Sequence, residues 1–291
     1  MSDPASKQLD GGAPGVESSP LDADSDQLVP FLRWAGGKRW FVAYHQHLVP
    51  RKFNRYFEPF LGGGSMYFHL APQDAVLSDV NVDVIRAFEG IKREPEQVQL
   101  HLELHKTLHS SEHYYDVRDS EPAGLAEQAA RVIYLNRTCF NGIYRLNKAG
   151  RFNVPMGERC QVLMPTDNFA ATSGLLQGAD VLLGDFEAMI DKAAEGDLVF
   201  ADPPYTVRHN TNGFVLYNEN LFSWSDQVRL ADTLERAKGR GVKILSTNAD
   251  HASVRDLYRK RKFRIRTVSR FSPIAAQATS RKQFSELVIS G

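Results

Sequence analysis

The sequence predicts an α/β fold built on a doubly wound, mostly parallel sheet that carries an inserted, mainly helical segment. From Val29 onwards, apolar stretches of strand length alternate with stretches of helical periodicity, which is typical of such a sheet. The interval from about Glu94 to Pro165 interrupts this alternation with successive helical patterns and a Gly- and Asn-rich stretch. With 291 residues, 42% of them hydrophobic, the chain is long enough to bury a large core.

The expected elements follow in order along the chain. Buried parallel strands are predicted at 54–60, 75–79, 181–184, 197–201 and 242–247. Helices are predicted at 81–92, 225–240 and 251–260, and the stretches 263–269 and 284–290 predict an antiparallel edge hairpin. Within the insertion we expect a helix at 127–136 and a hairpin at 144–153.

The formal net charge is zero, but the charges are unevenly distributed. Residues 1–28 hold six acidic side chains against Lys7 alone and have few large apolar groups, so they predict a disordered acidic tail. The remaining residues carry 34 basic and 29 acidic side chains, a net charge of +5, and the stretch 255–282 is strongly basic. That stretch either follows the phosphates of a nucleic acid or forms a solvated helix end and strand edge.

The cysteines and the apolar runs exclude several classes of protein. Cys139 and Cys160 form no CxxC pair, which argues against a thiolate metal site or a disulfide framework, and a reducing cytoplasm is the expected location. No apolar run is long enough to span a bilayer, and the first residues lack the pattern of a secretory signal. We therefore expect no membrane partner.

A glycine turn follows the first predicted strand. Residues 56–65 read Tyr-Phe-Glu-Pro-Phe-Leu-Gly-Gly-Gly-Ser, and consecutive glycines let a backbone bend sharply and approach a ligand closely. Because open α/β sheets bind ligands at the carboxyl ends of their strands, the turn is a candidate ligand site, although a tight connection without a ligand is the alternative. The pattern is neither GxGxxG nor a phosphate loop, so a dinucleotide or triphosphate is not indicated.

Asp79 ends the next predicted strand. Its carboxylate is an acceptor for both hydroxyls of a ribose, or alternatively the N-cap of the following helix, a role for which Asn81 competes. Together, the glycine turn and this acid suggest a cofactor that contains adenosine.

A third strand end carries Asp202, Pro203, Pro204 and Tyr205 after the apolar run 198–201. The prolines fix the backbone and lack N–H donors, so that carbonyl groups remain available as acceptors. An acid and a carbonyl can receive both hydrogens of an amino group while an aromatic ring stacks on the attached base. By itself the segment is equally well explained as a turn, but the glycine turn and Asp79 favour function.

With these segments in place, the sequence resembles the DNA adenine methyltransferases of the Dam type, the site-specific N6-adenine enzymes of the alpha type. The resemblance extends from Phe31 to the C-terminus and rests on five segments in the order of the family: 31–38 (Phe-Leu-Arg-Trp-Ala-Gly-Gly-Lys), 57–65, Asp79, 136–145 and 202–205. Each segment alone is modest evidence, but five in this order are highly specific.

The resemblance implies a Rossmann-like class I methyltransferase. Residues 29–93 and 166–291 would form the catalytic domain, and residues 94–165 the target-recognition subdomain with its β-hairpin. The implied reaction transfers a methyl group from S-adenosylmethionine to N6 of a flipped-out adenine in double-stranded DNA, at a GATC-like site. It yields S-adenosylhomocysteine and needs no metal.

The resemblance also implies roles for single residues. The cofactor-binding set would be Trp34, Lys38, Phe60, Gly62, Gly64, Asp79, Asp185, Phe186 and Asp202, and the catalytic set Asp202, Pro203 and Tyr205. Trp34 and Lys38 would contact the methionine part of the cofactor, whereas without the resemblance they read as a core and a surface residue. Asp185 would border the cofactor adenine, or otherwise only cap a helix.

The implied DNA-binding residues are Arg33, Arg137, Phe140, Asn141, Ile143, Arg145 and Pro155. Phe140 would wedge into the space left by the flipped base, and Arg145 and Arg33 would read guanines, with phosphate or solvent contact as the alternative. Residues 155–160 depart from the aromatic and basic composition usual after the hairpin, which leaves the outer base contacts open.

Two other functions remain to be separated from this one. A similar pocket could methylate N4 of cytosine, although those enzymes more often have Ser in place of Asp202, and a non-catalytic DNA-binding relative would not need the complete cofactor set. The sequence leaves open whether a cognate restriction endonuclease is a partner. We expect a monomer associated with the nucleoid.

Overall fold

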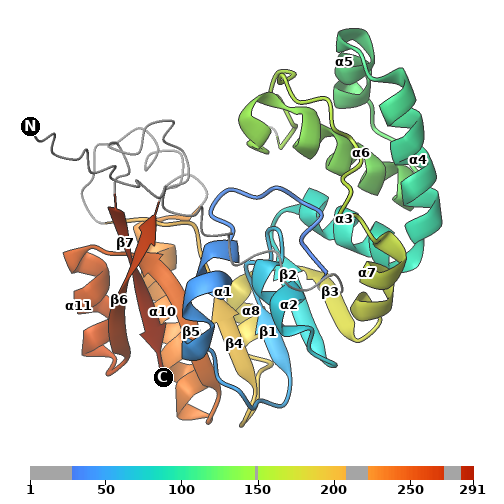
Figure 1. Ribbon diagram of the computed structural model, residues 1–291. Coiled ribbons are helices and arrows are strands. Elements are labelled where there is room, and N and C mark those ends of the chain that lie inside the picture. Colours follow the sequence, from blue (N-terminus) through green and yellow to red (C-terminus); the bar gives the residue numbers. More distant parts are fainter. Residues whose placement is uncertain (1–27, 148–149, 208–221, 272–282) are drawn as a thin grey trace, which may run out of the picture.

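The computed structural model describes residues 28–147, 150–207, 222–271 and 283–291, and a seven-stranded sheet lies at the centre of this part of the chain (Figure 1). The strands are β1 (Tyr56–Glu58), β2 (Ala75–Asp79), β3 (Ala179–Leu183), β4 (Leu198–Ala201), β5 (Lys243–Ala249), β6 (Arg264–Phe271) and β7 (Gln283–Ser290). Their order is β3-β2-β1-β4-β5-β7-β6, with β7 antiparallel to both of its neighbours and the other pairs parallel. The doubly wound fold and the edge hairpin are confirmed.

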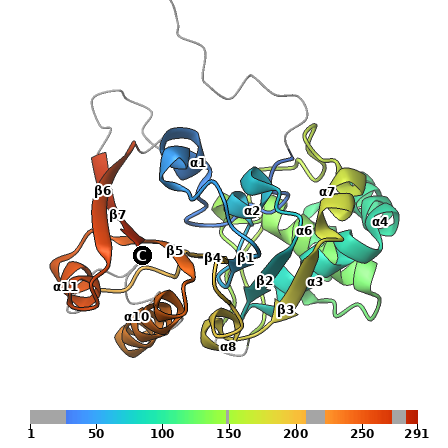
Figure 2. The ribbon, with the colours of Figure 1, turned by 90° about the horizontal axis from the view of Figure 1, so that it is seen from below.

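Helices cover both faces of the sheet (Figure 2). On one face lie α8 (Phe186–Ile190), α10 (Trp224–Gly239) and α11 (Ala252–Lys260); on the other lie α1 (Arg39–His45), the short helix η1 (Gln46–Leu48) and α2 (Ser65–Leu70). Alternate residues of one strand serve the two layers: Phe57 of β1 packs in the core under α8 and α10, whereas Tyr56 packs in the core under α1 and α2. This alternation follows from the period of two along a strand.

The strand order creates a switch point in the middle of the sheet. From β1 the chain moves outwards to β2 and β3, and then returns to place β4 on the other side of β1. In an open α/β sheet the crevice outside the carboxyl ends at such a point is the usual ligand site. Here β1 ends at Glu58, and β4 is followed at once by Asp202.

A group of helices lies at the end of the sheet that β3 forms (Figure 1). It comprises α3 (Val82–Arg93), α4 (Pro95–Leu108), α5 (Ser111–Asp119), α6 (Leu125–Thr138), the single turn η2 (Phe140–Gly142) and α7 (Phe169–Leu176). Helix α6 packs on α3 so closely that a Cβ at Gly90 would collide with Ala129. One apolar core runs from the sheet into these helices, so their position relative to the strands is fixed.

Most of the remaining expectations can be compared with the structure. The predicted helices at 81–92, 127–136, 225–240 and 251–260 are present as α3, α6, α10 and α11. The hairpin predicted at 144–153 is reduced to one bridge between Leu146 and Phe152. The predicted acidic tail, except Leu28, lies outside the described residues, as do Arg281 and Lys282 of the basic stretch. Within the described ranges, no helix combines the length and the apolar character that crossing a membrane requires.

Candidate active site

Asp202, directly after β4, has both carboxylate oxygens engaged. Its Oδ1 accepts a hydrogen bond from the Thr247 hydroxyl of β5 at 2.6 Å, and its Oδ2 lies 2.7 Å from Nζ of Lys38. Lys38 is buried at the N-cap of α1, so the ion pair joins the start of this helix to the end of a central strand. A neighbouring strand and a helix therefore hold Asp202 at the switch point.

Lys38 and Tyr205 form the surroundings of this carboxylate. Nζ of Lys38 also donates to the carbonyl oxygen of Gly36 at 2.8 Å and lies 5.0 Å from the centre of the Tyr205 ring. The Tyr205 hydroxyl donates to Oε2 of Glu286 at 2.7 Å. Burial raises the pKa of Tyr205 well above its ordinary value, and Asp202 and Glu286 reinforce this, so the phenol stays protonated as a donor. Lys38, Asp202 and Tyr205 were all predicted from the sequence as site residues, whereas Thr247 and Glu286 were not.

The glycine turn between β1 and α2 lies beneath Trp34. Gly62 and Gly64 have φ values of +47° and +69°, which L side chains rarely adopt. A Cβ at Gly62 would come within 2.6 Å of Cδ1 of Trp34, so a side chain at this position would displace the indole. Trp34 in turn stacks on Tyr144 with ring centres 5.7 Å apart. The turn thus requires glycine, both for its backbone conformation and for the close approach of Trp34.

Asp79 lies beside this turn at the end of β2. Its Oδ2 accepts from the Gly62 N–H and its Oδ1 from the Asn81 N–H, both at 2.9 Å. Asn81, not Asp79, caps α3 by accepting from the N–H of Asp83. Burial raises the pKa of Asp79, although the backbone donors favour the charged form. A carboxylate has about four lone-pair sites, and the backbone N–H groups of Gly62, Asn81 and Val80 do not fill them all, so the group fits the acceptor role expected for ribose hydroxyls.

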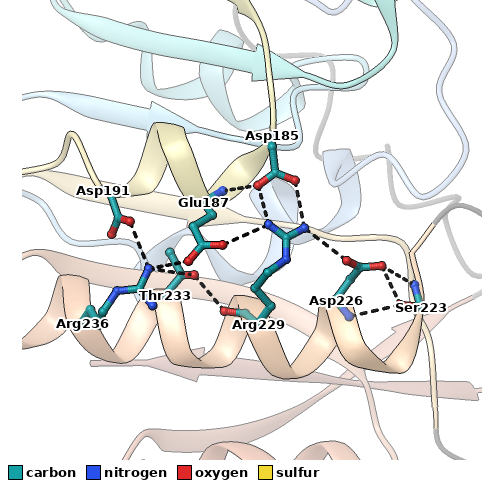
Figure 3. Close-up of polar contacts among 8 residues, drawn as sticks. All are labelled: Asp185, Glu187, Asp191, Ser223, Asp226, Arg229, Thr233 and Arg236. Atoms are coloured by element: carbon teal, nitrogen blue, oxygen red, sulfur yellow. Dashed lines mark hydrogen bonds and ion pairs between the residues drawn. The ribbon is translucent and has the colours of Figure 1, made fainter.

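Asp185 and Phe186 follow β3 at the same edge. Phe186 stacks on Phe60 with ring centres 5.3 Å apart. Asp185 caps α8 through the Glu187 N–H and receives two bonds from the Arg229 guanidinium at 2.6 and 2.9 Å, which lower its pKa (Figure 3). The contacts of Asp185 are thus those expected of a helix cap. Its side chain is 45% exposed, so the carboxylate remains accessible.

Glu58 is a buried acid that the sequence-based site omitted. It ends β1, between the strands that carry Asp79 and Asp202, and its Oε2 accepts from the Tyr56 hydroxyl at 2.8 Å and the Tyr67 N–H at 3.1 Å. Burial, reinforced by the two neighbouring carboxylates, raises the pKa of Glu58 to about 8, so it is largely protonated at neutral pH. The sequence signal that could have identified Glu58 is an acidic residue at the end of an apolar strand. Among the described residues, no group of three or more His, Cys, Asp or Glu side chains could hold a metal ion.

The residues expected to touch DNA lie mostly on the surface beyond α6. Phe140 and Ile143 are 53% and 46% exposed, and Asn141, Arg145 and Pro155 are exposed as well. An antiparallel bridge between Cys139 and Met156 holds this segment in place: the Phe140 N–H donates to the carbonyl oxygen of Pro155 at 2.9 Å, and the Gly157 N–H donates to that of Thr138 at 2.8 Å. Five of the seven expected residues therefore share one accessible segment.

Arg137 is different and requires a correction. It is 1% exposed, and all five N–H groups of its guanidinium have acceptors inside the protein: the carbonyl oxygens of Phe31 and Val162 and both carboxylate oxygens of Asp167. No donor remains for a phosphate or a base. Arg137 is thus a structural residue, because the segment 136–145 begins in the buried end of α6.

Arg33 is half-buried beside the exposed segment. The Asn136 side chain accepts from its backbone N–H and donates to its carbonyl oxygen, both at 2.7 Å, which ties the segment 31–38 to α6. Its Nη1 atom has no hydrogen-bond partner among the described residues. Arg33 and Arg159 flank Gly142, and burial together with the charge of Arg159 lowers the pKa of Arg33. Arg159, from the segment of unusual composition, is thus a second cation at this surface.

Comparison with known proteins gives a consistent result. The family model described as D12 class N6 adenine-specific DNA methyltransferase matches residues 34–274. Type II methyltransferase M1.LlaDCHI of Lactococcus lactis subsp. cremoris is 35% identical over 279 residues, which cover 93% of this chain and 98% of that protein. DNA adenine methylase of Vibrio cholerae is 32% identical over 250 residues, covering 82% and 90%. Type II methyltransferase M.MjaIII of Methanocaldococcus jannaschii is 31% identical over 245 residues, covering 77% and 85%.

The structural role of Arg137 can be tested by substitution. Arg137→Met leaves the Asp167 carboxylate without its cation and removes three hydrogen bonds to the carbonyl oxygens of Phe31 and Val162. We therefore expect the free energy of unfolding to fall by about 3–5 kcal/mol. The exposed pair of Arg118 and Asp119 offers a matched control, and Arg118→Met should cost less than about 1 kcal/mol. Urea unfolding measures both, and equal losses in the two variants would contradict the assignment.

The shifted pKa of Glu58 predicts a pH-dependent stability. Between its ordinary value near 4.5 and about 8, the folded protein retains a proton that the unfolded chain has lost. The stability contributed by protonated Glu58 is therefore complete below pH 4.5 and is lost as the pH rises through about 8. Glu58→Gln cannot ionise but keeps an acceptor for Tyr56. Between pH 5 and 9, the free energy of unfolding measured with urea should fall in the wild-type protein by an amount on the order of a few kcal/mol, and this fall should be absent from the variant. Parallel pH profiles for the two proteins would refute this.

Proposed function

Because the chain belongs to the D12 class N6 adenine-specific DNA methyltransferase family, we propose that it transfers the methyl group of S-adenosylmethionine to N6 of a flipped-out adenine in duplex DNA, at a GATC-like site. The observation that carries the proposal is the setting of Asp202, an acid that Lys38 and Thr247 fix at the switch point directly before two prolines. Residues 29–93 and 166–291 would form the catalytic domain.

The carboxyl edge of the sheet fits the proposed cofactor. The glycine turn at Gly62 and Gly64 excludes side chains, and Asp79 beside it offers the acceptor for a ribose. The half-buried ring of Phe60, which stacks on the buried Phe186, would offer an aromatic surface for an adenine. Asp185 would border the same ring, with Trp34 and Lys38 near the methionine part. When bound, S-adenosylmethionine supplies a methyl group made electrophilic by the attached sulfonium.

The chemistry required of the protein is mainly orientation. The carboxylate of Asp202 and the carbonyl oxygen of Pro203 would accept the two hydrogens of N6, and Tyr205 would stack on the flipped base. The negative charge of Asp202 would also stabilise the positive charge that develops on N6. No strong general base is needed, because N6 becomes acidic once it carries positive charge, and after the methyl group is transferred it can release one proton to water.

Residues 94–165 would supply target recognition. The exposed ring of Phe140 would fill the gap left by the flipped base, with Asn141, Ile143 and Pro155 on the same segment. Arg145, which is exposed, would read a guanine by gripping O6 and N7 together, and Arg33 would contact a second one.

The central test is the identity of the modified nucleoside. The protein is incubated with labelled S-adenosylmethionine and mixed duplex DNA, the DNA is digested, and the labelled nucleoside is identified. We expect label on N6-methyl-2′-deoxyadenosine and a loss of at least about 100-fold in Asp202→Asn, which removes the charge and one acceptor.

Asp191→Asn is the matched control, because Asp191 lies on the far end of α8 and pairs with Arg236. This variant should retain the wild-type rate. Label on N4 of cytosine, or full activity of Asp202→Asn, would overturn the proposed reaction.

Recognition by Arg145 predicts a change in specificity. Arg145→Ala should lower the preference for GATC over sites with one substituted base pair by about 10- to 100-fold, since a bidentate guanine contact contributes about 1–3 kcal/mol of discrimination. Methylation rates on matched duplexes measure this ratio. Arg151→Ala, which removes another exposed arginine of the same turn, should leave the ratio unchanged, and an unchanged ratio in Arg145→Ala would refute the assignment.

A further inference from the structure

Glu286 of β7 places a second buried carboxylate beside the proposed active site. It pairs in register with Ala249 of β5, two residues beyond Thr247, and its side chain reaches the Tyr205 hydroxyl at 2.7 Å. Glu286 is only 5% exposed. Because burying a carboxylate is costly unless it has partners, its contacts are expected to be specific.

The same oxygen of Glu286 also faces Lys38. Nζ of Lys38 lies 3.8 Å from Oε2 of Glu286 and 2.7 Å from Oδ2 of Asp202, so one ammonium group stands between two carboxylates. Glu286 therefore contacts both groups that surround Asp202. It reaches them from a strand that joins the sheet only at the end of the chain.

We propose that Glu286 is a positioning residue for adenine methylation, holding the Tyr205 ring and the Lys38 ammonium in place on either side of Asp202. This inference rests on the proposed function. A bond to the hydroxyl fixes the plane of the Tyr205 ring, which is the surface on which the flipped base would stack. Because Glu286 also attracts Lys38, the lysine neutralises Asp202 less completely. Asp202 therefore keeps the negative charge that stabilises the positive charge developing on N6.

Three variants separate these two contributions. Glu286→Gln keeps an acceptor for Tyr205 but removes the charge that attracts Lys38. Glu286→Asp keeps the charge but is one methylene shorter, so it draws back from the Tyr205 hydroxyl. Tyr205→Phe removes the same hydrogen bond from its other end but keeps an aromatic ring at this position.

The experiment measures single-turnover methyl transfer from labelled S-adenosylmethionine to a duplex containing one target adenine, together with KM for DNA and the melting temperature. We expect Glu286→Gln and Glu286→Asp each to slow transfer by about 10- to 100-fold, with KM for DNA changed less than about 3-fold. The double variant Glu286→Asp, Tyr205→Phe should transfer at a rate within about 3-fold of the slower single variant, because the two substitutions break the same hydrogen bond.

Glu235→Gln on α10 is the matched control, because this glutamate is half-exposed and its nearest cation is Arg261; it should transfer at the wild-type rate. Wild-type rates in both Glu286 variants, additive losses in the double variant, or rate losses that merely follow a lowered melting temperature would overturn the positioning role. Absence of transfer by the wild-type protein itself would refute the proposed function and this inference with it.

Discussion

The ion pair between Lys38 and Asp202 is the contact on which the arrangement of the site depends. It joins the N-terminus of α1 to the end of β4, and both groups are largely withdrawn from water. Two charges in such a position are tolerated only when they meet each other and their remaining hydrogen-bonding capacity is satisfied. Here the Gly36 carbonyl and the Thr247 hydroxyl complete the set, so the segment 31–38, β4 and β5 are held in one geometry. The position of the acid is thus a property of the fold and not of a single turn.

The strand order also creates an electrostatic problem, since it brings Glu58, Asp79 and Asp202 close together at one edge. Because β1 lies between β2 and β4, Glu58 is placed between Asp79 and Asp202. Each acid is accommodated differently. Asp79 is stabilised by backbone N–H groups, Asp202 by a cation and a hydroxyl, and Glu58 by retaining its proton. Ligand chemistry and stability are coupled at this edge, because the charges of Asp202 and Asp79 help to raise the pKa of Glu58.

Residues that end parallel strands could be placed from the sequence, and contacts made across the sheet could not. Asp79, Asp202 and the glycine turn share an edge because the carboxyl ends of parallel strands do so, and periodicity was sufficient to find those strands. Glu286 is 81 residues from Tyr205, and its place depends on β7 inserting antiparallel between β5 and β6 in a particular register. No local pattern specifies that register. Arg137 was misassigned for a related reason, because a motif read as one unit crosses from a buried helix end into an exposed turn.

The burial of Arg137 has a consequence for how such an enzyme diversifies. The pair with Asp167 and the carbonyl contacts anchor the C-terminal end of α6 from beneath, whereas Phe140, Ile143 and Arg145 stand above it on the surface. The buried anchor and the exposed residues proposed to contact DNA are therefore separate sets of side chains. Substitutions in the exposed set leave the anchor intact, so selection can replace them one at a time while the end of α6 keeps its packing. Under the proposed function, a change of target site made in this way would leave the chemistry at Asp202 unaltered, which makes the surface beyond α6 the part of the molecule open to evolutionary change.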